Sequence, residues 1–324
     1  MLTVRWRRYF ACASISLSLL TCYSIWYSAS AYGKLYLDVP PLSKNSCQNS
    51  HVFTNGTVNL SAPLPVIDAF LYNGEEALLD VRLMELDGVV QYHLLIQAEC
   101  DFRGAKSNTK RFNASDARYA RTPILHHFVP CDEMQAENPW KNEGTSRNYF
   151  TKAFLPQIIN ATFAILSDVD EVPRRDALVH LIKSGWEHKT IYAMGAHFYY
   201  YNVNCEKKDL WYVGPRVFET RLLRDKTWSE VRTESKVHRL PNSAWHFSYF
   251  MTKEDIARKI HSFSHRELDK PEFTDFGHIC KAVHSCGDLF DRKGERCCTE
   301  NCSPLPRAMS TNISLWGPQL NACA

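Results

Sequence analysis

The stretch FAILSDVDEVPRRDAL, residues 163–178, joins an apolar run directly to three carboxylates. Residues 163–166 have the composition of a buried strand, and Asp168, Asp170 and Glu171 follow at its end. In open α/β sheets, ligands bind beyond the carboxyl ends of the strands. The stretch therefore predicts a strand of an α/β sheet with a ligand site at its tip.

The first two carboxylates of this stretch are separated by one residue. Strand alternation would turn Asp168 and Asp170 to the same side, where their mutual repulsion calls for a cation. Mn²⁺ or Mg²⁺ prefers such oxygen ligands and also binds diphosphate oxygens, as in a sugar-nucleotide donor. The pattern predicts a metal that neutralises a departing nucleoside diphosphate. The alternative is a solvated acidic turn at the start of the helix that begins near Arg174.

Strand and helix patterns alternate around the acidic stretch. Apolar runs predict strands, and apolar residues at helical spacing predict helices. The predicted strands are residues 66–72, 92–97 and 124–129, and the predicted helices are residues 73–90 and 147–159. Asn73 is the expected N-cap of the first helix. This order predicts an α/β fold with a mixed, mostly parallel sheet flanked by helices.

The N-terminal segment predicts insertion into a membrane. Arg5, Arg7 and Arg8 precede an uncharged run at residues 9–33, which is long enough to span a bilayer. We expect a cytoplasmic tail at residues 1–8 and a transmembrane signal anchor at residues 9–30. A cleaved signal peptide is the alternative, because Ala29-Ser30-Ala31 fits a cleavage site. Both readings place the rest of the chain in the secretory pathway.

The remainder of the chain divides into a stem and a folded body. Residues 31–62 are polar, contain Pro40-Pro41 and show no apolar periodicity, so they predict a lumenal stem. Residues 63–324 form the predicted catalytic domain, which ends in a cysteine-rich tail. An apolar fraction of 45% suits a large core, and a net charge of +3 without basic runs argues against a nucleic-acid partner.

Sequons and cysteines agree with a lumenal body. Glycosylation acceptors occur at Asn55, Asn59, Asn113, Asn160, Asn301 and Asn312. Ten of the twelve cysteines lie beyond the apolar segment and could pair in an oxidising lumen. The tail sequence CCTENC, residues 297–302, with His278 and His284 nearby, leaves a zinc site as the alternative to disulfides.

Four blocks of the sequence resemble glycosyltransferase family 17, the family of the bisecting-GlcNAc transferases (β-1,4-mannosyl-glycoprotein 4-β-N-acetylglucosaminyltransferases). The blocks are IDAFLYNGEEALLDVRLMELDGVVQYHLLIQAEC (67–100), SDVDEVPRRDAL (167–178), WHFSYFMTKEDIARKIHSFSHRE (245–267) and CGDLFDR (286–292). The resemblance implies a GT-A-like fold, UDP-GlcNAc as donor, Mn²⁺ dependence and inversion at the anomeric carbon. The implied product is GlcNAc on a mannose of an N-linked glycan, made by a single-pass type II enzyme of the Golgi membrane.

The resemblance also assigns roles to residues of the acidic and Trp-His blocks. Asp170 would be the direct metal ligand, Asp168 would hold the ribose or a metal-bound water, and Glu171 is their companion. His246 would complete the metal shell, although a core histidine is an equal alternative.

Further roles follow from position along the chain. Glu99, after a predicted strand, could hold the nucleoside, and Arg147 could reach a phosphate. An inverting transfer needs a carboxylate base, for which we prefer Glu267 to Glu219. An ordinary surface residue is the alternative for Glu99 and Arg147, and a helix-end salt bridge is the alternative for Glu267.

Two alternative functions, of different kinds, remain. One is a non-catalytic lumenal carbohydrate-binding protein, and the other is a transferase with another sugar donor or acceptor. An aromatic group could form a sugar-stacking surface, although core packing is the preferred interpretation of most of its members. The group consists of Tyr199, Tyr200, Tyr201, Trp211 and Tyr212.

Overall fold

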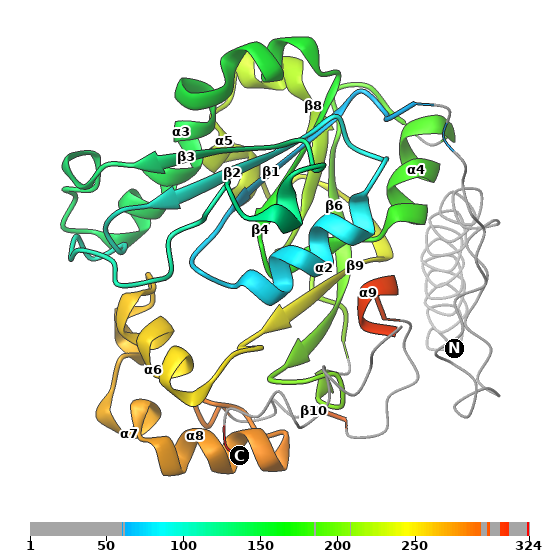
Figure 1. Cartoon of the computed structure of the whole chain (residues 1–324). Coiled ribbons are helices and arrows are strands. Elements are labelled where there is room, and N and C mark those ends of the chain that lie inside the picture. Colours follow the sequence, from blue (N-terminus) through cyan, green and yellow to red (C-terminus); the bar gives the residue numbers. More distant parts are fainter. Residues whose placement is uncertain are drawn as a thin grey trace, which may run out of the picture. The chain divides into compact units, whose positions relative to one another are not determined.

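A mixed β-sheet forms the centre of the described part of the chain, and helices pack on both of its faces (Figure 1). The computed structural model describes residues 60, 62–184, 186–207, 209–292, 297–298, 305–310 and 323. All of them fall within one unit, Asn45–Ala324. Among these residues no helix combines the length and the apolar character needed to cross a membrane. The predicted cytoplasmic tail and transmembrane segment, and almost all of the predicted stem, lie outside the described residues.

The first four strands form a parallel sheet in the order β3-β2-β1-β4. They are β1 (Val66–Leu71), β2 (Tyr92–Ala98), β3 (Ile124–Val129) and β4 (Phe163–Asp168). In the register, Leu71 at the end of β1 pairs with Ile96 of β2 and with Asp168 of β4. The carboxyl ends of these strands therefore meet at one edge, and the predicted α/β fold is confirmed.

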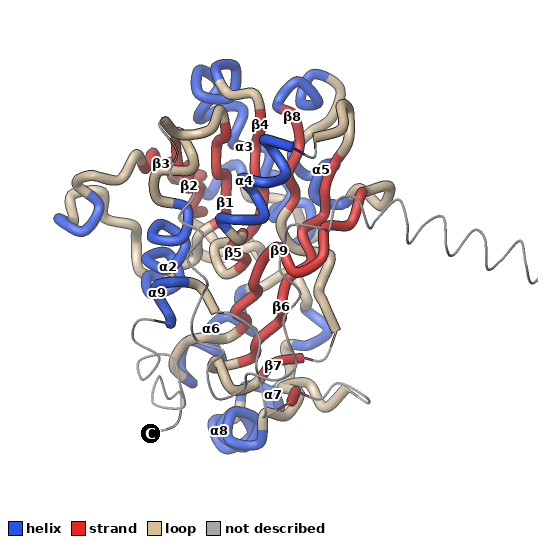
Figure 2. The backbone as a smooth tube through the Cα atoms, turned by 90° about the vertical axis from the view of Figure 1, so that its right-hand side faces the viewer, coloured by secondary structure: helices blue, strands red, loops and turns tan. Residues whose placement is uncertain are grey.

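The second half of the sheet is built differently. Strand β8 (Arg216–Glu219) lies antiparallel to β4, and β6 (Ile191–Tyr200) lies antiparallel to β8. Strand β9 (His238–Ser248) runs parallel to β6, and the short β5 (Glu171–Pro173) runs antiparallel to β9. Two short strands, β7 (Glu206–Lys207) and β10 (Cys297–Cys298), extend the edge. Figure 2 shows β6 and β9 side by side.

The sheet is mixed, as predicted, and its longest pairings are parallel. Of the nine strand pairings, five are antiparallel. Parallel neighbours need a crossover connection, usually a helix. Between β6 and β9 the only described α-helix is the six-residue α5 (Trp228–Thr233), so the short connections there favour antiparallel pairing.

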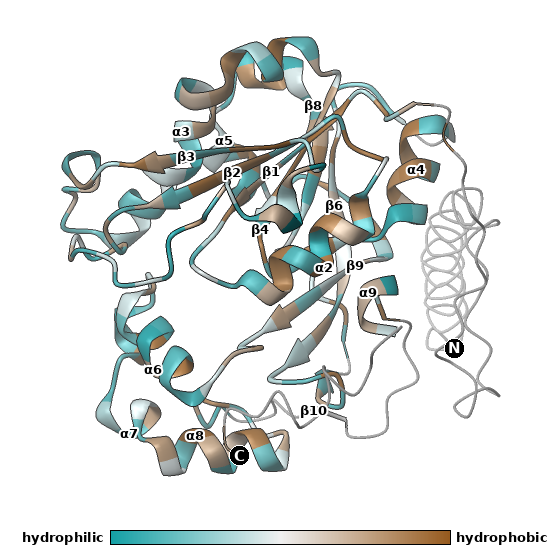
Figure 3. Ribbon diagram, in the orientation of Figure 1, coloured by the Kyte–Doolittle hydropathy of each residue, from teal (hydrophilic) through white to brown (hydrophobic). Residues whose placement is uncertain are grey.

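Helices cover the two faces of the parallel half. On one face, Ile67 and Ala69 of β1 pack with α3 (Pro139–Asn160) and α5. On the other, Phe70 packs with α2 (Glu76–Leu86), while α4 (Arg175–Ser184) lies over β6 and β8. Figure 3 shows the apolar residues concentrated in the strands between these layers. The C-terminal helices α6 (Lys253–Ser262), α7 (Pro271–Thr274) and α8 (Phe276–Ser285) form a separate apolar cluster with the ends of β6 and β9.

Three disulfides lie within the described residues, and they confirm that cysteines of the body pair. They are Cys100–Cys131, Cys205–Cys286 and Cys280–Cys323. The first joins the ends of β2 and β3 at the edge where the strand ends meet. The third engages Cys280, which removes the cysteine nearest to His278 from any zinc site.

A buried carboxylate connects three helices on the α2 face. Glu85 of α2 is 4% exposed and accepts hydrogen bonds from the backbone N–H groups of Arg175 in α4 (3.2 Å) and Arg307 in α9 (Arg307–Ser310; 3.3 Å). Burial raises the pKa of Glu85 to about 7, against the opposing effect of these two hydrogen bonds. The native chain therefore retains a proton on Glu85 at pH values where the unfolded chain has lost it.

This proton makes stability depend on pH in a definite direction. Between the ordinary pKa of 4.5 and about 7, the native state binds more protons than the unfolded state, so the free energy of unfolding falls as pH rises. We expect the loss from this group to approach about 3 kcal/mol above pH 7. In Glu85→Gln that part of the slope should disappear, as measured by urea unfolding at pH 5, 6, 7 and 8. An unchanged slope in the variant would contradict the assignment.

Candidate active site

The acidic stretch forms a tight turn between β4 and β5. Strand β4 ends at Asp168 and β5 begins at Glu171, so Val169 and Asp170 lie in the turn. Arg82 of α2, which is fully buried, donates to the carbonyl oxygens of Asp168 (3.2 Å) and Glu171 (2.8 Å). The carbonyl of Asp170 accepts from the backbone N–H of Phe247 (2.8 Å). Contacts to the backbone thus fix the turn from both sides.

Arg82 is itself held by a buried network. Its guanidinium makes two hydrogen bonds to the carboxylate of Asp68 in β1, one of them 2.8 Å from Nε to Oδ2, and a third to Ser167 Oγ at 2.7 Å. His93 of β2 contacts the same carboxylate at 2.8 Å. Burial raises the pKa of Asp68, but Arg82 and His93 outweigh it and bring that pKa down to about 2. Asp68 therefore stays ionised and keeps Arg82 in place.

The three carboxylates of the turn have different partners. Asp168 accepts from Arg147 of α3 (3.1 and 3.3 Å) and from Arg232 of α5 (3.3 Å). Glu171 accepts two hydrogen bonds from Arg232 (2.8 and 2.7 Å) and one from the N–H of Asp168 (3.0 Å). Burial opposes ionisation of Asp168, yet the two arginines hold its pKa below the usual range.

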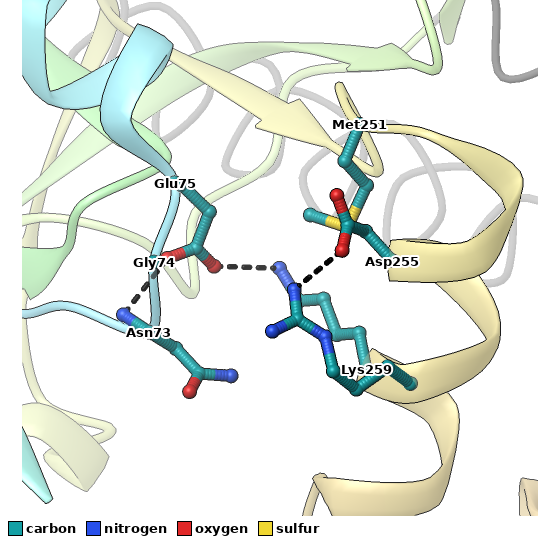
Figure 4. Close-up of a pocket in the computed structure, with 7 residues that line it drawn as sticks. Asn73, Gly74, Glu75, Met251, Asp255 and Lys259 are labelled. Atoms are coloured by element: carbon teal, nitrogen blue, oxygen red, sulfur yellow. Dashed lines mark hydrogen bonds and ion pairs between the residues drawn. The ribbon is translucent and has the colours of Figure 1, made fainter. Parts of the chain in front are cut away.

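Asp170 faces a different cation. Its Oδ2 lies 3.0 Å from Nζ of Lys259 in α6 and 3.8 Å from Nε2 of His246 in β9. Burial opposes ionisation, but Lys259, followed by His246, brings the pKa of Asp170 far below its usual range. Figure 4 shows Lys259 facing Glu75, the residue before α2, and these two side chains are 3.5 Å apart. Lys259 therefore lies between two carboxylates.

Asp168 and Asp170 line the same cleft, as expected, but strand alternation is not the cause. The strand stops at Asp168, so the rule of period two does not reach Asp170. Within the described part of the chain, no group of three or more His, Cys, Asp and Glu side chains is placed to hold a metal ion. Asp168 pairs with Arg147 and Arg232 and does not complete such a group.

Asp170 and His246 remain as a possible pair of metal donors. The register places Glu171 opposite His246 in the β5–β9 pairing, which brings the imidazole beside the turn. A separation of 3.8 Å between Oδ2 and Nε2 is a span that one divalent ion, about 2.1–2.2 Å from each donor, could bridge. This carboxylate and imidazole suit Mn²⁺, provided that a substrate and water supply the other ligands.

The turn opens into a large cleft of about 870 Å³. The carboxylates of Asp168, Asp170 and Glu171 line it together with Arg147, Arg232, Lys259 and His246. Other parts of its lining come from the N-terminal part of α3 and from the segment after α6. A volume of this size, with charged groups gathered at one place, suits a polar ligand larger than a single sugar.

The structure brings together only some of the residues predicted from the sequence. Glu99 and Glu267 are not part of the cleft lining: Glu99 pairs with Arg111 (3.3 Å), and Glu267, whose side chain is 66% exposed, contacts His265 (2.6 Å). Glu219 is buried and binds His188 and Arg221, also outside the cleft. Among the predicted aromatic group, Tyr199, Tyr200 and Tyr201 pack in the core, and Tyr200 and Trp211 also line the cleft.

Sequence reasoning missed Arg82, Arg232 and Lys259. Arg82 lies inside the predicted helix 73–90, and no feature of that pattern marks it as buried. Lys259 adjoins the apolar face of α6, between Ile256 and Ile260, and that position is the one signal of burial that the sequence offers. Arg232 lies in a short helix without any recognisable motif.

A family comparison gives the clearest result. The model of Glycosyltransferase family 17 matches residues 36–305. None of the curated proteins that were compared matches the chain.

Solved structures give more distant likenesses. The 4-diphosphocytidyl-2C-methyl-D-erythritol synthase of Anaerococcus prevotii DSM 20548 is 10% identical, with a TM-score of 0.32 over 54% of this chain and 86% of that one. The inositol-1-phosphate CTP transferase of T. maritima is 12% identical, with a TM-score of 0.33 over 56% and 87%. The WbbM bifunctional glycosyltransferase is 12% identical, with a TM-score of 0.30 over 57% and 40%.

Loss of Arg232 should destabilise the fold through Glu171. The carboxylate of Glu171 is 3% exposed, and Arg232→Met would leave it buried without its cation, at a cost of about 3–5 kcal/mol in the free energy of unfolding. Adding Glu171→Gln should restore part of that loss, as measured by urea unfolding. Arg118→Met, which breaks exposed pairs, is the control and should cost less than about 1 kcal/mol. If the losses in the free energy of unfolding of the two single variants simply add in the double variant, Arg232 and Glu171 are not coupled and the prediction fails.

Proposed function

We propose, from the premise that the chain belongs to glycosyltransferase family 17, that it transfers GlcNAc from UDP-GlcNAc to a mannose of N-linked glycans with inversion. The observation that carries the proposal is the acidic turn at the end of β4, which faces a cleft of about 870 Å³ among three cationic side chains. A diphosphate needs cations around it, and a sugar-nucleotide needs a cleft of this size.

The cationic side chains around the turn can bind the donor. Arg147, Arg232 and Lys259 now hold carboxylates, with donor–acceptor distances of 3.1, 2.7 and 3.0 Å. Arginine matches phosphate oxygens with two parallel hydrogen bonds, so Arg147 is well suited to exchange Asp168 for a phosphate of the donor. These side chains would then stabilise the negative charge that grows on the departing diphosphate.

Asp170 and His246 would hold Mn²⁺ or Mg²⁺ in this proposal. When bound, the ion supplies positive charge to the diphosphate as the bond to the sugar breaks. Asp168, with 34% of its side chain exposed, is the most accessible carboxylate of the turn and would accept from a ribose hydroxyl or a metal-bound water in addition to its arginines.

The acceptor hydroxyl must lose a proton as it attacks. Glu267 stays the proposed base: its carboxylate lies 2.6 Å from Nδ1 of His265, which lines the cleft. Of the carboxylates predicted for this role, Glu219 is the less suitable because it is already bound to Arg221 and His188. The nucleoside contact predicted for Glu99 likewise remains a proposal.

The cellular setting is part of the same proposal. A type II protein of the Golgi membrane, anchored by residues 9–30, would present the body to lumenal glycoproteins. The disulfides of the body support an oxidising compartment.

The test is a transfer assay with the purified full-length protein in detergent. UDP release and the mass of an N-glycan acceptor are followed for a panel of UDP-sugars with Mn²⁺ present. We expect a gain of one GlcNAc, lost with EDTA and reduced at least about a hundredfold in Asp170→Asn. Asp80→Asn, a carboxylate outside the cleft, is the matched control and should keep full activity.

Other outcomes distinguish the rivals. A mass gain from a different UDP-sugar would replace the proposed donor. A folded protein that binds the glycan but transfers nothing, with binding unaffected by Asp170→Asn, would identify a carbohydrate-binding protein in place of an enzyme.

A further inference from the structure

One face of α3 runs along the cleft. The residues of this helix that line the cleft are Trp140, Glu143, Ser146 and Arg147. Positions three, four and seven apart share a helix face, so Trp140, Glu143 and Arg147 form one row. Arg147 marks the inner end of the row because it contacts Asp168, the last residue of β4.

Trp140 marks the outer end of the same row. It precedes Arg147 by seven residues, which is about 10 Å along a helix axis. Helix α3 leads into β4 and packs on the sheet, so its N-terminal end lies on the side where the parallel strands end. Trp140 therefore lies about 10 Å along the helix axis from Arg147, in the direction away from the start of β4.

The indole is unusually accessible and contacts the second half of the cleft. Trp140 is 50% exposed, although tryptophan is highly buried on average. Its ring lies edge-on to the imidazole of His265, with centroids 4.7 Å apart at 86°. His265 in turn contacts Phe263, whose ring is 5.6 Å away. Together Trp140, His265 and Phe263 form an aromatic platform that joins α3 to the segment after α6.

We infer that this platform binds a pyranose ring of the acceptor saccharide; the inference rests on the proposed function. A pyranose presents an apolar C–H face that stacks on an aromatic ring, and a rim of hydroxyls that need hydrogen-bond partners. Glu143, one turn from Trp140, supplies a carboxylate acceptor at the platform, where Ser264 and Arg147 already orient it.

The distribution of charge along the row favours an acceptor sugar over the donor. Arg147, Arg232 and Lys259 gather at the inner end, where a diphosphate would be attracted. Glu143 lies between the two ends of the row and pairs with Arg147, and Asp101 also lines the cleft. Carboxylates repel a nucleotide but accept hydrogen bonds from a neutral, hydroxyl-rich ligand. A saccharide on the platform would extend inward past Glu143 to reach the donor.

The experiment compares Trp140→Ala with the wild type in three measurements. The first is KM for a free N-glycan oligosaccharide, which should rise about tenfold or more, corresponding to the loss of one stacked ring. The second is KM for UDP-GlcNAc, and the third is the slow release of UDP without acceptor; both should change less than about twofold. Trp140→Phe should recover part of the affinity for the oligosaccharide because it keeps an aromatic face.

Leu155→Ala is the matched control, since Leu155 lies on the same helix, is 47% exposed and is not part of the cleft lining. It should change none of the three measurements. A rise in KM for UDP-GlcNAc in Trp140→Ala would overturn the inference and assign the indole to the nucleobase. Unchanged constants in Trp140→Ala would overturn it as well.

A binding measurement separates this inference from the proposed function. If the wild type shows no turnover, saturation-transfer NMR of the same oligosaccharide on the wild type and on Trp140→Ala tests the platform directly. A signal that is lost in Trp140→Ala supports the platform although the transferase has failed, and an equal signal in both proteins overturns it.

Discussion

The active cleft depends on one buried ion pair, Asp68 with Arg82. Neither side chain is exposed, and Arg82 joins three elements: it binds Asp68 of β1 and the carbonyl oxygens at the two ends of the acidic turn. A buried guanidinium is costly unless all its donors are engaged. Arg82 meets that requirement only when the turn has its present shape. The need to engage all of its donors therefore constrains the positions of Asp168, Asp170 and Glu171.

The cleft is built from two halves of the chain, which supply different charged groups. The parallel strands and α2 supply the carboxylates and the backbone that holds them, whereas α5, β9 and α6 supply Arg232, His246 and Lys259. Arg232, His246 and Lys259 come from positions 61 to 89 residues beyond the carboxylates of the turn that they contact. Arg232 and Lys259 relieve the repulsion among these carboxylates, which Arg147 of the first half relieves only at Asp168. The electrostatic pairing therefore also joins the two halves of the fold.

The sequence predicts local structure here better than tertiary pairing. The strand runs ending at Leu71, Ala98 and Asp168 are visible in the sequence because their apolar patterns need no distant partner. Asn73 was a wrong N-cap: the helix starts at Glu76, after Gly74, whose φ of +96° breaks the helical path. The side chains of Arg232 and Lys259 could not be assigned, because only the packing of α5 and α6 brings them to the turn.

Lys259 shows how such a site could exchange one cation for another. Its ammonium and an ion at Asp170 and His246 would share the same oxygen, Oδ2 of Asp170, and two cations there would repel each other. Glu75 lies 3.5 Å from Nζ, so Lys259 could leave Asp170 and still keep a carboxylate partner. The side chain is 21% exposed, which also lets water solvate the ammonium during that movement. Lys259 thus neutralises Asp170 in this structure, and Glu75 offers it a second partner if Asp170 is to bind the ion proposed above.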